Sequence, residues 1–159
     1  MEKYDELLIG LRQVIRAIDL YSKKLNKESG LTGPQLLVLQ AIANRDGVLA
    51  KQVADAINLS SATVTSILDR LEARDLVKRE RSTQDKRKVL LHLTEKGEQA
   101  VGDAPKPLQQ HFIDRFEKLE DWEQNMMIAN MQRIAKMMNA DDIDAAPVLE
   151  VGTIQQLSE

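Results

Sequence analysis

Two β-prone runs in a sequence rich in helix-forming residues are the feature that most constrains the fold. LVKRE at 76–80 and KVLLHLT at 88–94 have the length of strands, and the polar segment STQDKRK at 82–88 separates them. Two such runs joined by a short polar loop predict an antiparallel hairpin. The nonapeptide RSTQDKRKV at 81–89 contains four basic residues and one aspartate, so the hairpin carries a positive tip.

The composition predicts that the rest of the chain is mostly helical. Apolar residues make up 43% of the 159 residues, aromatic residues 3% and charged residues 30%, a mixture that favours helices over sheets. A chain of this length fits one compact unit.

The absence of cysteine excludes disulfides and thiolate metal sites. No stretch approaches the roughly 20 apolar residues of a membrane span, and the charged N-terminus lacks a signal peptide, so we expect a cytoplasmic protein without a membrane partner.

Two helices joined by a tight turn precede the hairpin. LAKQVADAI at 49–57 predicts a short helix, Asn58 to Ser60 a turn, and SATVTSILDRLEARD at 61–75 a longer helix. At about 100° per residue, Val64, Ile67, Leu68 and Leu71 share one side of that helix, and small polar residues cover the other. A helix-turn-helix needs small side chains there, because bulk keeps a helix out of the major groove. Any helical hairpin could produce the same pattern. The candidate recognition-helix residues are Ser60, Ser61, Ala62, Thr63, Thr65, Ser66 and Arg70.

A positive ribbon directly after such a helix is typical of a winged helix-turn-helix. The chain has a net charge of −3, yet residues 70–88 hold eight basic residues against four acidic ones, whereas residues 140–159 hold five acidic residues and no lysine or arginine. This segregation indicates a local polyanion-binding surface. The alternative is an ordinary solvated loop. The candidate wing residues are Arg81, Asp85, Lys86, Arg87 and Lys88.

The remaining segments predict long helices on either side of this region. Apolar residues from Tyr4 to Leu25 form two neighbouring stripes at helical spacing, which suggests a first helix that packs against its own core and a partner subunit. Thr32 and Gln35 predict a capping box for a helix from about Gly33, and Thr94 a cap for a later helix that Pro105 and Pro107 interrupt. Asp121 and Gln124 predict a second capping box before a methionine-rich stripe.

These segments resemble the MarR family of bacterial winged-helix transcription regulators. The similarity rests on LTGPQLLVLQAI, LSSATVTSILDRLEARDLVKR, DKRKVLLHLTEKG and LEDWEQ, and covers roughly residues 7–138. The family pattern D-x-R-x-x-x-x-x-L-T-x-x-G is met by Asp85, Arg87, Leu93, Thr94 and Gly97. The resemblance implies that Arg87 enters the DNA minor groove and that Asp85 holds it in place, since a narrow A·T-rich groove attracts a guanidinium.

The sequence departs from the family at two positions. Asp75 stands where glycine is frequent, and aspartate is among the few residues that tolerate a left-handed backbone. Ser66 stands where many members have a basic residue, so base contacts would depend on Ser61, Thr63, Thr65 and Arg70.

A finer similarity connects residues 14–37 and 119–152 to the MarR-type repressors of compatible-solute genes, often called EctR or CosR. It implies an osmotic or ionic signal. In the family, effectors bind between the dimerisation helices and the winged lobe. The candidate walls of an effector pocket are therefore Leu11, Ile15, Ile18, Leu36 and Leu39.

The resulting hypothesis is a mainly α-helical homodimeric repressor that binds a pseudo-palindromic double-stranded DNA operator and is released by a small-molecule, osmotic or ionic signal. Residues 1–30 and 98–140 would form the dimerisation region, 31–97 the winged helix-turn-helix and 141–159 an acidic tail. We expect the tail from residue 140 to dock through apolar anchors, either bracing the dimer or competing with DNA. The anchors are Val148, Leu149, Val151, Ile154 and Leu157.

Two other classes of function are alternatives to this hypothesis. A winged-helix protein-interaction module would keep the fold without binding DNA, but it has no need for Arg74, Lys78, Arg79 and the basic wing residues on one side. An enzyme would have to use His92 or His111, which lie near no nucleophile motif or phosphate loop. Two histidines without usable spacing are weak metal ligands, so we expect no catalytic activity, no cofactor and no metal site.

Overall fold

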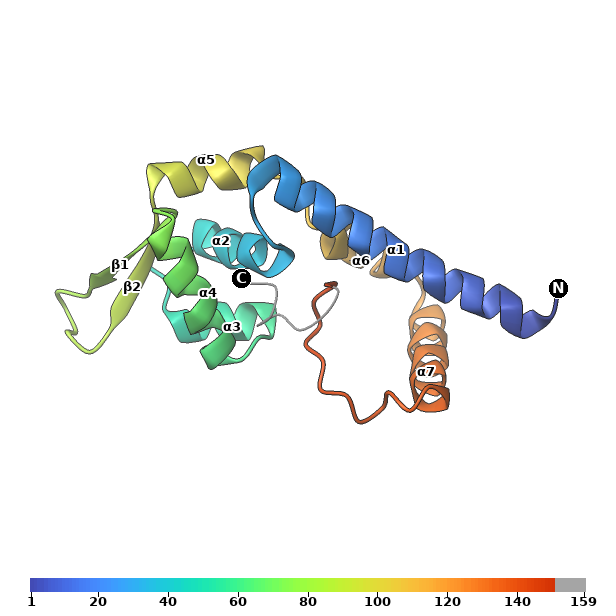
Figure 1. Cartoon of the computed structure of the whole chain (residues 1–159). Coiled ribbons are helices and arrows are strands. Elements are labelled where there is room, and N and C mark those ends of the chain that lie inside the picture. The colour runs from blue at the N-terminus through green and yellow to red at the C-terminus, as the bar shows by residue number, and fades with distance from the viewer. Residues whose placement is uncertain (151–159) are drawn as a thin grey trace.

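The computed structural model describes residues 1–150, in which seven helices and a two-stranded sheet follow one another in the order of a winged helix (Figure 1). The elements are α1 Lys3–Ser29, α2 Gly33–Asn44, α3 Ala50–Ile57, α4 Ser61–Ala73, β1 Val77–Arg81, β2 Val89–Leu93, α5 Glu95–Asp103, α6 Leu108–Phe116 and α7 Asp121–Met137. This order confirms the expected mainly α-helical winged helix-turn-helix.

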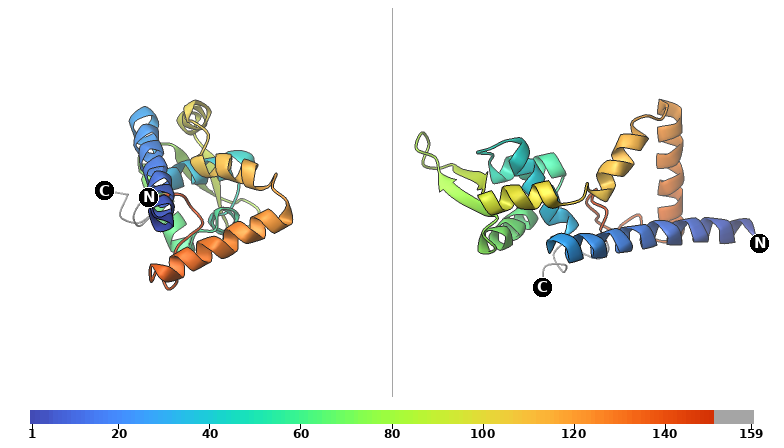
Figure 2. Two further views of the ribbon diagram at one scale, coloured as in Figure 1. Left: turned by 90° about the vertical axis from the view of Figure 1, so that its right-hand side faces the viewer. Right: turned by 90° about the horizontal axis from the view of Figure 1, so that it is seen from above.

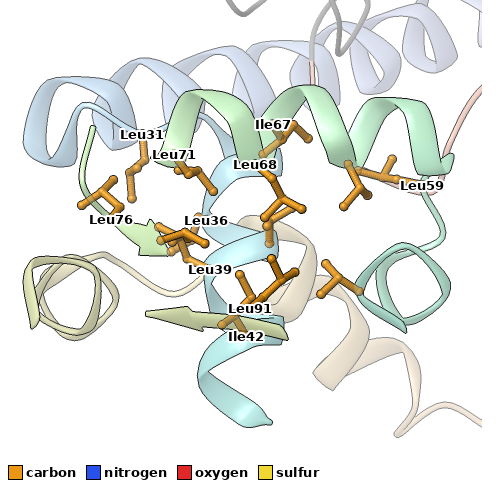
Figure 3. Close-up of a cluster of buried hydrophobic side chains, with 14 of the residues drawn as sticks. Leu31, Leu36, Leu39, Ile42, Leu59, Ile67, Leu68, Leu71, Leu76 and Leu91 are labelled. Carbon is orange, nitrogen blue, oxygen red and sulfur yellow. The ribbon is translucent and has the colours of Figure 1, made fainter. Parts of the chain in front are cut away.

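A single apolar core holds the winged lobe together. Helices α2, α3 and α4 pack against one another, and the hairpin closes one side (Figure 3). Leu36, Leu39, Leu68, Leu71 and Leu91 are each at most 1% exposed. Burial of a leucine side chain contributes about 1.5–3 kcal/mol, so these five residues supply much of the lobe's stability. The apolar side predicted for residues 64–71 is the side that faces this core.

Side-chain caps fix where the helices begin. The Thr32 hydroxyl accepts a hydrogen bond from the Gln35 amide at 3.3 Å, and the Gln35 side chain accepts one from the Thr32 amide at 3.1 Å. This is the expected reciprocal capping box. The Thr94 hydroxyl accepts from the Gly97 amide at 3.0 Å, which confirms the predicted start of α5.

The hairpin is aligned by its strand register and by the turn that precedes it. β1 and β2 pair antiparallel with Val77 opposite Leu93 and Arg81 opposite Val89. Asp75, at the end of α4, has a φ of 59° and so adopts the left-handed conformation expected of it. Gly97 lies against this turn so closely that an added Cβ would be 2.0 Å from the carbonyl oxygen of Leu76. Only glycine fits at this contact.

Helix α5 packs on the winged lobe. Ala100, Val101 and Ala104 contact the core cluster, and α5 contacts α2 and β2. The boundary expected after residue 97 falls within α5. Pro105 and Pro107 lie between α5 and α6, so the prolines interrupt the helix as predicted.

Three helices extend away from the lobe with large apolar surfaces. In the described part of the chain, α1 has one buried residue, Leu25, and α6 and α7 have none. Figure 2 shows α1 running past α6, with α7 lying crosswise to α1. The exposed apolar residues on α1 and α7 include Tyr4, Leu7, Leu8, Ile9, Val14, Ile15, Leu20, Met126, Met127, Ile128, Met131 and Met137.

The capping of α7 differs from the prediction by one residue. Glu120, not Asp121, precedes the helix, and its amide donates to the Glu123 carboxylate at 2.9 Å. Gln124 instead donates through its side-chain amide to the carbonyl oxygens of Phe116 and Leu119. The predicted Asp121–Gln124 box is wrong because Gln124 closes the preceding turn, a contact outside the D-x-x-Q pattern.

The acidic segment after α7 runs back toward the winged lobe (Figure 1). Val148 and Ala146 pack against the core cluster, and Leu149 is half-buried. Two of the predicted anchors, Val148 and Leu149, therefore contact the protein, while Val151, Ile154 and Leu157 lie outside the described residues. Across residues 1–150, no helix has the length and apolar character needed to cross a membrane.

Candidate nucleic-acid interface

Helix α4 presents a small, polar and accessible surface at its N-terminal end. Ser61, Ala62, Thr65 and Ser66 are exposed, whereas Thr63 and Arg70 are half-buried. The Ser60 hydroxyl caps the helix by accepting from the Thr63 amide at 3.1 Å, and it lies 2.7 Å from the Thr63 hydroxyl. The Thr65 hydroxyl donates to the Ser61 carbonyl at 2.9 Å. Ser60 and Thr63 are therefore held in place before any ligand binds.

The wing tip is organised around Asp85. Its carboxylate accepts from the Arg87 amide at 3.1 Å and from the Arg87 Nε at 3.3 Å. Its carbonyl oxygen accepts from the Lys88 amide at 2.9 Å. The Arg87 side chain is 92% exposed, so it is tethered at Nε while its terminal nitrogens face solvent. This is the geometry expected of an arginine that a neighbouring aspartate aligns.

Ser82 supports this arrangement and was not singled out from the sequence. Its hydroxyl accepts from the amides of Gln84 and Asp85, each at 3.2 Å, and its own amide donates to the Lys88 carbonyl at 2.9 Å. Serine commonly turns a loop in this way. The spacing S-x-x-D of Ser82 and Asp85 is the sequence pattern from which this turn could have been predicted.

The positive surface is smaller than the sequence suggests. Arg81, Lys86 and Lys88 are exposed on the ribbon, as expected. Arg79, however, pairs with Asp69 at 2.7 Å and Glu72 at 3.2 Å, and Arg74 donates to the Gly30 carbonyl at 2.8 Å. Arg79 and Arg74 brace β1 and α1 against α4, so neither is a freely available DNA contact. The basic surface is concentrated on the wing.

His92 joins the hairpin to the loop between α2 and α3. Its Nδ1 lies 2.7 Å from the Asp46 carboxylate and its Nε2 lies 3.4 Å from the Glu80 carboxylate. The Gly47 amide donates to the Leu91 carbonyl beside this contact. His92 therefore has a positioning role for the wing, which the sequence did not reveal because Asp46 is distant along the chain.

Comparisons with known proteins agree with this arrangement. A family model described as the MarR family matches residues 29–88. The chain is 45% identical over 95 residues to the HTH-type transcriptional regulator MgrA of Staphylococcus aureus, covering 59% of this chain and 65% of MgrA. It is 36% identical over 116 residues to the transcriptional regulator HosA of Escherichia coli O111:H-, covering 69% of this chain and 79% of HosA. The chain belongs to the MarR family.

A solved MarR-type fold supports the architecture. The crystal structure of the S. aureus MepR–DNA complex matches with a TM-score of 0.56 at 21% identity, covering 86% of this chain and 96% of that chain. At this identity the match shows the fold alone. MgrA and HosA are both named as transcriptional regulators. The MgrA match spans slightly less than two thirds of that protein's length.

The two histidines of this MarR protein lie on different elements. His92 lies on β2 and His111 on α6. Within residues 1–150, no cluster of three or more His, Asp or Glu side chains is arranged to hold a metal ion.

The residues expected to line an effector pocket lie in different parts of the structure. Leu36 and Leu39 are fully buried in the core of the winged lobe. Ile18 lines an apolar cavity of about 520 Å³ between α1, α6 and α7. Ile15 is exposed and Leu11 half-buried on the same helix, but neither lines this cavity. Other walls come from Val14, Leu108, His111, Phe112, Arg115, Phe116 and Met127. The aromatic and charged residues of α6 were missed because their spacing carries no motif.

Proposed function

We propose that this protein is a homodimeric transcriptional regulator, acting as a repressor, that binds a pseudo-palindromic site in double-stranded DNA in the bacterial cytoplasm. The observation that carries the proposal is the wing tip, where Asp85 holds the backbone and Nε of an otherwise exposed Arg87. A pre-aligned guanidinium loses less conformational freedom when it enters a narrow minor groove.

Helix α4 is the proposed major-groove element. Its exposed Ser61, Thr65 and Ser66 are short enough to let the helix approach base edges, and the Ser60 and Thr63 hydroxyls lie at its N-terminus. Serine and threonine contact either donors or acceptors on bases, so they give modest discrimination. Arg70 would add a base contact from the same helix. The exposed wing residues Arg81, Lys86 and Lys88 would contact phosphates, which position the protein without reading sequence.

Dimerisation follows from the apolar surfaces of α1 and α7. Such continuous exposed apolar residues exceed what a soluble monomer usually presents. A second copy covering them would place two winged lobes side by side, as a palindromic site requires.

We further propose that the regulator responds to a small molecule or to osmotic or ionic conditions. The apolar cavity beside Ile18 carries His111 and Arg115 on its α6 wall, a lining that suits a small apolar anion. The osmotic alternative rests on the resemblance of residues 14–37 and 119–152 to repressors of compatible-solute genes. Binding titrations on the operator with aromatic carboxylates, with compatible solutes and with increasing potassium glutamate separate these signals.

The decisive experiment is selection and sequencing of genomic fragments that the purified protein retains. We expect enrichment of fragments that share an inverted repeat, and retention on heparin at low salt. Enrichment without a repeat would contradict the dimeric arrangement. Absence of both enrichment and heparin retention would favour the protein-interaction module. One observation supports this alternative: Arg79 pairs with Asp69, and Arg74 donates to the Gly30 carbonyl, so both contact groups within the protein.

A further inference from the structure

Residues 146–150, hereafter the strap, lie across the junction between α1, α2 and α6. The strap follows exposed residues 141–145, yet Ala146, Val148, Leu149 and Glu150 are all half-buried. Val148 and Ala146 contact the core of the winged lobe, and Leu149 lines the cavity formed by α1, α6 and α7. One short segment therefore contacts the lobe and the proposed dimerisation helices at once.

Two hydrogen bonds and one close approach hold the strap. The Ser22 hydroxyl of α1 donates to the Glu150 carboxylate at 2.9 Å, and the Leu149 amide donates to the Gln109 side chain of α6 at 3.4 Å. The other carboxylate oxygen of Glu150 faces the first residue of α2, where a Cβ added to Gly33 would lie 2.8 Å from it. A carboxylate at a helix N-terminus interacts favourably with the helix dipole.

Gly33 gives the strap its close approach to α2. Its φ is not left-handed, so its backbone conformation does not require glycine. What glycine provides is the space that the Glu150 carboxylate fills.

We infer that the strap is an internal clasp that fixes the orientation of the winged lobe relative to α1 and α6, and that its release frees the lobe to move. The physical reason is that the strap contacts both parts at once. It adds to the burial of Leu25 in the core of the lobe, the Arg74–Gly30 hydrogen bond, and the hydrogen bond from the Tyr21 hydroxyl to the Lys106 carbonyl at 2.8 Å. Burial raises the pKa of the Tyr21 phenol above its ordinary value, and the negative charge of Glu150 in the strap also raises it. The regulatory meaning of the clasp depends on the proposed function, whereas its existence does not.

Strap docking can be measured directly because the chain contains no cysteine. Val148→Cys places a thiol in the strap, and Ile143→Cys places one in the exposed residues 141–145 that precede it. Gly33→Ala should speed labelling of the Val148→Cys thiol by about two- to tenfold, the range expected for loss of one net hydrogen bond in a local opening equilibrium. Labelling of Ile143→Cys should not change. Gly102→Ala is the matched control, since no side chain or backbone outside its own helix lies within 4 Å of its Cβ position.

A double variant identifies the Glu150 carboxylate as the group displaced. Once Glu150→Ala has removed the carboxylate, Gly33→Ala should produce no further acceleration of labelling. Additive acceleration would overturn the assignment of the contact to Glu150. Unchanged labelling in both Gly33→Ala and Glu150→Ala would overturn docking of the strap through Glu150.

Lobe orientation is the second readout and requires no DNA. Spin labels at Arg12 of α1 and Asp55 of α3, both exposed, report the distance between the two parts of one chain when labelled protein is diluted with unlabelled protein. Gly33→Ala should broaden this distance distribution and Gly102→Ala should leave it unchanged. A faster labelling rate with an unbroadened distribution would show a strap that does not control the lobe, and would overturn the inference. Failure to bind DNA would contradict the proposed function but would leave both readouts intact.

Discussion

At the residue scale, the pairing of Asp85 with Arg87 makes a quantitative prediction. Arg87→Ala should weaken operator binding by about 1–3 kcal/mol, the cost of a specific groove contact. Asp85→Ala should cost less, because it removes only the alignment. In the Arg87→Ala background, Asp85→Ala should be neutral or slightly favourable, since the carboxylate then only repels phosphate. Fluorescence anisotropy titrations of the four proteins on one operator give this cycle.

Asp85 also shapes the wing backbone through its bond from the Arg87 amide, so the cycle needs a milder variant. Asp85→Asn keeps an oxygen that can accept from this amide and removes the charge that attracts the Arg87 guanidinium. A loss in Asp85→Asn equal to that in Asp85→Ala would assign the effect to charge, and a smaller loss would assign it to loop shape.

Lys86 and Lys88 provide the contrast, because we expect them to contact phosphates. Lys86→Ala and Lys88→Ala should lower affinity for all sequences and reduce the salt dependence of binding. Placing G·C pairs beneath the wing should weaken binding of the unmodified protein to the operator. The same change should weaken binding of the Arg87→Ala variant very little. Equal losses for Arg87→Ala and Lys86→Ala on both DNAs would mean that the wing is a general electrostatic patch.

At the scale of elements, the junction of hairpin and α5 depends on Gly97. A methyl group there would meet the Leu76 carbonyl, which cannot retreat because it accepts from the Thr94 amide at 3.1 Å. We expect Gly97→Ala to destabilise the protein by about 2–3 kcal/mol through overpacking. Gly102→Ala in the same helix has open space and should stabilise by about 0.5–1 kcal/mol. Urea denaturation followed by circular dichroism measures both, and equal effects would contradict the proposed packing.

At the scale of the whole molecule, the apolar stripes of α1 and α7 predict a stable dimer. Light scattering at micromolar concentration should give about twice the 17.9 kDa of one chain. Ile128→Glu should raise the dimer dissociation constant on the order of tenfold or more, since burial of an isoleucine contributes about 1.5–3 kcal/mol. Asn130→Glu, an exposed polar position of the same helix, is the control. A monomeric mass for the unmodified protein would remove the basis for a palindromic site.

The sequence by itself determined the features that depend on neighbours within a few residues. The Thr32–Gln35 box, the Thr94 cap, the left-handed turn at Asp75 and the Asp85–Arg87 pair all join residues at most three positions apart or depend on one residue's own backbone. The hairpin followed from two β-prone runs of strand length around a polar loop. The buried side of α4 followed from a period of 3.6 residues, because that period is a property of the helix itself. Most of the candidate interface lies on these elements, and it was therefore predictable.

The tertiary structure alone decided which groups from distant segments meet. Arg74 contacts a carbonyl 44 residues away, His92 an aspartate 46 residues away, and Ser22 a glutamate 128 residues away. No local pattern encodes such partners, so the sequence counted Arg74 and Arg79 as free charges. Whether a charge is available or an apolar residue is buried depends on what the fold brings beside it, because Coulomb attraction and apolar burial act through space and not along the chain.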